Sequence, residues 1–226
     1  VLLKESLEAG LSAWKGKAKK ARVANPTGAL SAKTSPIQRA GSSQVNLVVA
    51  QSILLNPKDD DFLAFQVMNH MLGGSATGRL FLNLRVDKGY TYGSYSRIDA
   101  RDKGLLWTAE AQVRPEIAAE ALAEMRKEIL RMRDQEVPPE QLESAKRYLS
   151  GVFLMRLASL EGFADYLIQL EKEGLDPKKV LAERLAKIAA LTPAQLRAAA
   201  LKYLDPDKMV TVVVSDGPAL GPAAAP

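Results

Sequence analysis

Apolar residues recur at helical spacing just before the densest glycine run of the chain. The spacing predicts a helix from about Asp59 to Leu72, with one inward stripe made of Phe62, Phe65, Met68 and Leu72. Gly73 and Gly74 follow at once. We expect them to end the helix, because glycine tolerates the left-handed backbone conformation that a helix end often needs.

A second, shorter helix and a strand are predicted after the glycines. Ser75 or Thr77 can cap this helix, which carries inward Leu80, Phe81 and Leu84. The turn signal at 87–89 separates it from a run of strand formers at 90–95, where alternation places on one face Tyr90, Tyr92 and Ser94. A helix–turn–strand corner of this kind can bring Arg85 and Tyr92 together.

Alternating and helical patterns continue along the rest of the chain. Residues 105–113 alternate cleanly and should pair antiparallel with the strand at 90–98 through a turn at 100–104. Further strands are predicted at 44–50 and 209–214, with a weak one within 30–39. Helices are predicted to open at Pro115 and at Pro138-Pro139-Glu140, and two more lie near 177–189 and 192–203. Hairpins with segregated helices predict an α+β domain, a largely antiparallel sheet with helices packed on one face.

Inward stripes are predicted within the long helices. The helix that opens at Pro115 carries Ile117, Ala121, Met125 and Ile129 at four-residue spacing. The helix that opens at Pro139 should bury Leu142, Ala145, Leu149, Val152, Phe153 and Arg156. After a break near 158–162, the pattern continues through Leu160, Phe163, Leu167 and Leu170. We interpret these stripes as core and not as a cofactor site.

Charge is uneven along the 226 residues. The first 40 carry eight Lys or Arg and two acids, hence +6, whereas the remainder carries −1 of the total +5. A nucleic-acid interface would rest on this basic tail alone, which lacks clustered aromatic residues for base stacking, so a solvated linker is favoured. No apolar run approaches the ~20 residues of a membrane span. We expect a soluble protein, and the absence of cysteine leaves both cytoplasm and periplasm open.

The central run resembles a known family of proteases. Three motifs carry the resemblance: Leu-Gly-Gly from 72, Arg-Leu-Phe-x-x-Leu-Arg from 79, and Lys-Gly-x-Thr-Tyr-Gly from 88. Together they resemble the C-terminal, non-zinc half of pitrilysin/insulinase-like metallopeptidases, a family that includes the mitochondrial processing peptidases. The resemblance covers about Ser43 to Ser215.

The resemblance implies a fold and a role. In the family, a zinc half and a non-zinc half close like a clamshell around a chamber, and the non-zinc half offers an Arg and a Tyr to an extended peptide. By motif these are Arg85 and Tyr92, because the family's tyrosine directly precedes the glycine; Tyr90 is the nearest competitor. Arg85 and Tyr92 are therefore expected to bind substrate. Tyr92 is also expected to be catalytic, since its hydroxyl can donate to the scissile carbonyl.

The family's zinc motif is missing from this sequence. His-x-x-Glu-His needs two histidines, and the chain has one, His70, and no cysteine. We therefore expect no cofactor here, with zinc on a partner domain or subunit, and no peptidase activity from this chain alone. His70 is expected to pack or to cap the end of its helix.

The resemblance also suggests a domain organisation. Residues 1–14 are predicted to be a helix, and Trp14-Lys15-Gly16 resembles the end of the family's preceding domain. We expect a terminal helix and basic linker left from that domain at 1–22, the peptidase-like domain at 23–216, and a disordered tail at 217–226. On this interpretation the chain is a fragment or processed half of a longer polypeptide.

The sequence leaves three functions open. The first is the substrate-binding half of a zinc peptidase, which holds an extended peptide against a sheet edge. The second is a non-catalytic structural subunit with the same fold, and a homo-oligomer is left open. The third is a nucleic-acid module acting through the basic tail. Nucleotide binding by the glycines at 73–78 is disfavoured, because a phosphate loop needs Gly-Lys and lies between a strand and a helix.

Overall fold

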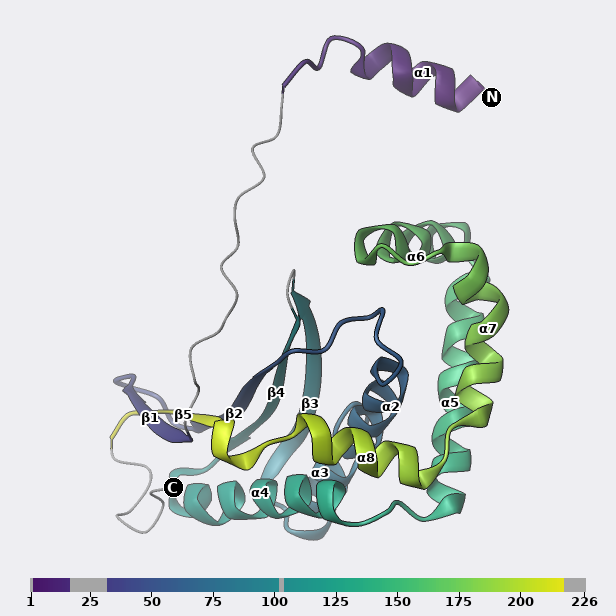
Figure 1. Ribbon diagram of the computed structural model, residues 1–226. Helices are drawn as coiled ribbons and strands as arrows, with labels where there is room; N and C mark the ends of the chain where they lie inside the picture. Colours follow the sequence, from purple (N-terminus) through teal and green to yellow (C-terminus); the bar gives the residue numbers. More distant parts are fainter. Residues whose placement is uncertain (1, 17–31, 102–103, 218–226) are drawn as a thin grey trace.

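The computed structural model describes residues 2–16, 32–101 and 104–217, and its centre is one five-stranded sheet. The strand order is β1-β5-β2-β4-β3; β1 and β5 run parallel and every other pair is antiparallel (Figure 1). The strands are β1 (Lys33–Gln38), β2 (Val45–Ile53), β3 (Thr91–Arg101), β4 (Gly104–Val113) and β5 (Val210–Ser215). The predicted largely antiparallel sheet is confirmed, and β3 lies at one edge.

Helices cover one face of this sheet. They are α2 (Phe62–Leu72), α3 (Arg79–Phe81), α4 (Ala118–Asp134) and α8 (Pro193–Tyr203), all on one side in Figure 1. The odd-numbered residues of β2 are buried, whereas those between them are half-buried, as one covered face requires. The core between the layers includes Leu47, Phe65, Trp107, Met125 and Leu196. The α+β prediction is therefore confirmed, together with the inward stripes of α2 and α4.

Three further helices project from the sheet layer and form a smaller cluster. They are α5 (Pro139–Leu157), α6 (Leu160–Glu173) and α7 (Pro177–Ala190); Figure 1 shows α6 across the ends of α5 and α7. Their own core is Phe153, Tyr166 and Leu170. Caps define the starts of two of them: the Ser159 hydroxyl accepts from Gly162 N, and the Asp176 carboxylate accepts from Lys178 N.

Part of the stripe predicted for these helices is wrong. Leu160 is 86% exposed, Val152 is 44% exposed and Arg156 is also exposed. Tyr166, which the stripe omitted, is buried. The physical reason for the exposure of Leu160 is that α6 packs mainly against α5 and α7. Only the side of α6 that faces these two helices is therefore buried. Periodicity indicates which face of a helix is apolar, but not whether another element covers it.

The N-terminal helix, α1 (Leu2–Leu11), is shorter than the predicted 1–14. The predicted linker at 15–29 lies mostly outside the described residues, as do the boundary at 22/23 and all but the first residue of the tail at 217–226. Within the described part, no helix is long and apolar enough to cross a membrane.

Candidate functional site

Arg85 lies on an unusual helix that faces the edge strand. The chain continues from α3 directly into a π-helix, η1 (Leu82–Asp87), which carries Arg85. π-Helical turns are rare and occur often at functional sites. The predicted side-chain cap is wrong: the helix begins after Gly78 with no side-chain hydrogen bond, and the hydroxyls of Ser75 and Thr77 bond each other at 2.9 Å.

Tyr92 lies at a β-bulge near the start of β3. Thr91 pairs with Val113 and Ser94 with Ala111, so three steps along β3 oppose two along β4. The Thr91 hydroxyl braces this bulge by donating to Gly93 O at 2.9 Å. As a result Tyr92 is 83% exposed while Ser94 is fully buried. The predicted common face of Tyr90, Tyr92 and Ser94 is wrong, because the extra residue turns Tyr92 away from the core.

The corner brings Arg85 and Tyr92 together. The guanidinium carbon of Arg85 lies 5.2 Å from the centre of the Tyr92 ring, within the range of a cation–π contact. Beside them, the rings of Phe81 and Tyr95 lie 5.7 Å apart. We call these four side chains the corner surface. Tyr90, the competing tyrosine, is half-buried and packs against the core.

A groove adjoins the corner surface on the open face of the sheet. Its volume is about 300 Å³, and it is lined by residues that include Asn46, Tyr92, Tyr95, Glu110 and Gln112. An ion pair between Arg97 and Glu110 spans β3 and β4 at 2.9 Å. Tyr92 therefore lies at the wall of a groove with a mixed polar and apolar lining, and an extended chain entering this groove would meet its ring.

The glycines before Arg85 allow the helix end to touch β3. A Cβ atom on Gly73 would lie 2.6 Å from Ser96 N, and one on Gly78 would lie 3.0 Å from Gly73 Cα. Gly73 O also accepts a hydrogen bond from Ser96 N at 2.9 Å. Neither Gly73 nor Gly74 has a positive φ. The predicted left-handed helix end is wrong: these positions require glycine for close approach of the backbone.

Asn69, a buried residue that the sequence analysis missed, stabilises the same corner from its core side. The indole N–H of Trp107 donates to Asn69 Oδ1 at 2.8 Å, and the Ser96 hydroxyl donates to Asn69 O at 3.3 Å. Asn69 thus links α2 to β3 and β4. The sequence does carry a signal for this role, because Asn69 is a polar residue within the apolar stretch of α2. A buried polar group is normally hydrogen-bonded, so such a residue is expected to bond a neighbouring element.

The π-helix is tied to α4 by a second polar network. Asn83 Nδ2 donates to Glu124 Oε2 and to Glu128 Oε1, both at 2.9 Å. The bond from Asn83 is the main cause that lowers the pKa of Glu124, with Lys127 adding to it. Because Asn83 is two residues from Arg85, this network helps to hold the helix turn that presents Arg85.

His70, the sole histidine, packs as predicted. Its ring stacks on that of Tyr148 with centres 5.0 Å apart, and burial lowers its pKa below the usual range. A protein zinc site needs three or four ligands. The described residues contain no group of three or more His, Asp or Glu side chains placed to hold a metal ion, so they do not fit a zinc site.

The chain is similar to proteins of one peptidase family. The sequence model of the family described as peptidase M16 inactive domain matches residues 3–149. The crystal structure of a peptidase M16 inactive domain from Pseudomonas fluorescens is 27% identical, with a TM-score of 0.84 over 97% of this chain and 52% of that one. No curated protein sequence matches the chain.

More distant structures share the fold. A protease from Helicobacter pylori is 19% identical, with a TM-score of 0.79 over 95% of this chain and 52% of that one. The periplasmic protease PqqL from Escherichia coli is 14% identical, with a TM-score of 0.70 over 95% of this chain and 24% of that one. This chain therefore spans about half the length, or less, of these three structures. The family match identifies the chain as a member of the peptidase M16 inactive-domain family.

Proposed function

We propose that this chain is the substrate-binding, non-zinc half of a zinc metalloendopeptidase. The observation that carries the proposal is the Arg85–Tyr92 pair: a π-helix carries Arg85, a β-bulge turns Tyr92 outward at the wall of a groove, and the two side chains are in contact. Membership of a family of inactive peptidase domains supports it. Zinc would be held by another domain or subunit.

The two side chains suit a peptide backbone. Arg85 carries a planar fork of donors that is always charged, which can hold a peptide carbonyl or a carboxylate. The Tyr92 hydroxyl can donate to the scissile carbonyl as negative charge develops on its oxygen, and one such donor is worth on the order of 3 kcal/mol of barrier. Tyr92 is exposed, so its hydroxyl is free to meet a substrate that enters the groove.

The edge strand limits how the peptide can pair. In the described part of the fold β3 pairs only with β4, which leaves its outer edge facing α3 and η1. Gly73 O already accepts from Ser96 N on that edge. Strand addition along β3 is therefore confined to short stretches on either side of Ser96, and the peptide is expected to lie beside Tyr92.

The first test is the native assembly. The protein is isolated from its source cells, its mass is measured, and each co-purifying chain is identified by peptide mass spectrometry. A complex or longer parent chain that contains His-x-x-Glu-His supports the proposal. A species without that motif would instead support the structural-subunit alternative.

The second test uses that assembly and a peptide that it cleaves. Tyr92→Phe should lower kcat about 10²–10³-fold, and Arg85→Gln should mainly raise KM if it holds the peptide backbone in both ground and transition states. Arg147→Gln, which removes an exposed charge from α5 away from the corner surface and its groove, is the matched control. Unchanged turnover in both Tyr92→Phe and Arg85→Gln would contradict the proposed role.

A further inference from the structure

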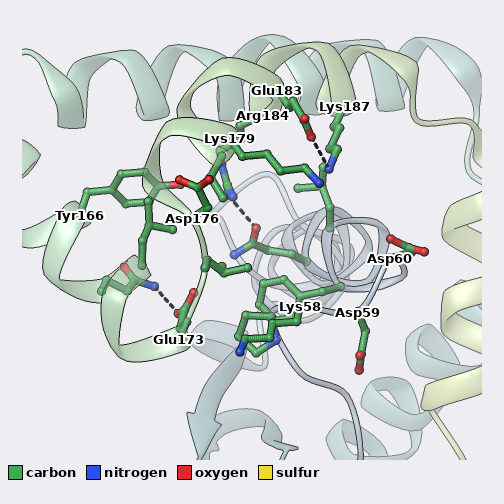
Figure 2. A pocket seen from close by; sticks show the side chains of 18 of the residues that line it. Lys58, Asp59, Asp60, Tyr166, Glu173, Asp176, Lys179, Glu183, Arg184 and Lys187 are labelled. Carbon is green, nitrogen blue, oxygen red and sulfur yellow. Dashed lines mark hydrogen bonds and ion pairs between the residues drawn. The ribbon is translucent and has the colours of Figure 1, made fainter.

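A second groove lies away from the corner surface, between the small helical cluster and the start of α2. Its volume is about 500 Å³, and most of its lining comes from the loop at 57–60, from α2 and from α6 and α7 (Figure 2), with Arg156 added by α5 and Gln195 by α8. None of the four corner-surface residues lines it. Apolar side chains contribute to the lining, among them Phe62, Leu63, Leu170, Leu175 and Val180.

Two buried donors at this groove have no partner. Tyr166 is 4% exposed, its ring packs edge-on against Phe153 at 5.5 Å, and its hydroxyl lies beside Arg184 without a partner of good hydrogen-bond geometry. Arg184 is held by Gln66, whose side-chain oxygen accepts from Nη2 at 2.9 Å, while its buried Nε also lacks a partner. A buried polar group without a partner costs about 1–3 kcal/mol, so these two atoms favour a ligand that accepts from both.

A second arginine adjoins the same tyrosine. The guanidinium carbon of Arg156 lies 4.9 Å from the centre of the Tyr166 ring. Within the described residues, neither Arg156 nor Arg184 forms an ion pair with a carboxylate. Burial raises the pKa of Tyr166 although both arginines oppose that rise, so its hydroxyl is protonated and can donate.

Most carboxylates that line the groove already accept a hydrogen bond or form an ion pair. The Asp59 and Asp176 carboxylates accept backbone N–H groups, from Asn56 at 2.8 Å and from Lys178 at 2.9 Å. Glu183 pairs with Lys187 at 2.9 Å, and Glu173 accepts from Gln169 at the same distance. Lys58 and Lys179 also line the groove. The positively charged groups beside Tyr166 are therefore the guanidinium groups of Arg184, which is half-buried, and of Arg156, which is exposed.

We propose that this groove binds a carboxylate that carries an apolar body. A planar carboxylate can accept from the Arg184 Nε–H and the Tyr166 hydroxyl together, with Arg156 adding charge. The apolar lining would hold the rest of the molecule, and the volume is typical of small-ligand sites. A peptide's C-terminal carboxylate and a free apolar acid share this chemistry.

Three probes test the proposal on the full chain. They are a blocked tripeptide ending in leucine with a free carboxylate, the same peptide as its carboxamide, and octanoate. Binding is measured by calorimetry and by the NMR signal of the Arg184 Nε–H, up to about 10 mM because millimolar affinity is within reach of such small ligands. The free acids should bind at least about tenfold more tightly than the carboxamide and should shift the Arg184 signal.

Variants separate a binding role from a packing role. Arg184→Gln and Arg156→Gln should each weaken binding of the acids about tenfold. Tyr166→Phe should weaken it a few-fold with little loss of thermal stability, because the hydroxyl has no partner of good geometry and the ring keeps its packing against Phe153. Arg147→Gln removes the same charge from an exposed position of α5 outside the groove and is the matched control.

The outcomes decide both the proposal and the source of the ligand. Tighter binding of the tripeptide acid than of octanoate assigns the groove to peptide C-termini, and the reverse assigns it to free apolar acids. Equal binding of acid and carboxamide, no shift of the Arg184 signal, or an equal effect of Arg147→Gln would overturn the proposal. No binding by any probe would overturn it as well.

Discussion

The close contact between Gly73 and β3 makes a sharp prediction about stability. In Gly73→Ala, the new methyl group would lie 2.6 Å from Ser96 N and 2.8 Å from Leu80 Cδ1. Ser96 N is backbone within a paired strand and cannot move without disturbing the ladder to β4. The contact must therefore open, and the hydrogen bond from Ser96 N to Gly73 O lengthens with it.

The expected cost follows from these two effects. Overpacking of a tight site costs about 1–3 kcal/mol, and a weakened hydrogen bond adds about 1 kcal/mol. Gly73→Ala should therefore lower the free energy of unfolding by about 2–4 kcal/mol, which corresponds to roughly 5–15 °C in Tm for a domain of this size. Gly151→Ala is the matched control: it lies within α5 with nothing within 4 Å of the new Cβ. It should stabilise by about 0.5–1 kcal/mol.

Urea unfolding followed by tryptophan fluorescence measures both variants. Trp107 is fully buried beside Asn69 and reports on this corner, whereas Trp14 is 78% exposed and contributes a nearly constant background. The two variants should move the unfolding midpoint in opposite directions. If Gly73→Ala stays within about 0.5 kcal/mol of the parent protein while Gly151→Ala behaves as expected, the close-approach explanation is wrong.

Three further predictions concern other parts of the fold. Burial lowers the pKa of His70, so near and below pH 6.5 the unfolded chain binds more protons than the folded chain. The free energy of unfolding should therefore fall as the pH is lowered from about 7.5 to 5.5. His70→Gln should flatten this part of the profile, and NMR titration of the sole imidazole checks the pKa. Asn69→Leu should destabilise by about 1–3 kcal/mol in urea unfolding, because the buried indole N–H of Trp107 loses its acceptor. Thr192→Ala should cost about 1 kcal/mol by thermal unfolding, because it removes the capping box of α8.

Much of the fold follows from local patterns. The strand at 105–113 alternates because helices cover one face of the sheet, and β4 indeed spans Gly104–Val113 with every odd-numbered side chain buried. The starts of α7 and α8 combine a capping residue with a first-turn proline, which fixes the position of each start within the sequence itself. Such signals need only neighbours in the chain, so the sequence predicts them well.

The details of the candidate site depend on distant residues instead. The bulge at Tyr92 exists because Thr91 and Ser94 pair with Val113 and Ala111, and simple alternation cannot show that register. Gly73 is required by contact with Ser96, which follows it by 23 positions. The sequence therefore predicted that Arg85 and Tyr92 meet. The π-helix, the β-bulge and the close glycine contact that bring them together are visible only in the three-dimensional structure.

The corner separates into parts with different physical roles. Gly73, Asn69 and Ser96 are buried, and changes there act on folding. Arg85 and Tyr92 are exposed, and a cation–π contact at such a position contributes about 0.5–1 kcal/mol. Tyr92→Phe keeps the ring and most of that contact and removes one oxygen atom. If Tyr92 serves packing alone, the variant matches the parent protein in every assay. A loss of turnover without loss of stability would instead assign the role to the hydroxyl, so this single atom distinguishes a substrate-binding half from a structural one.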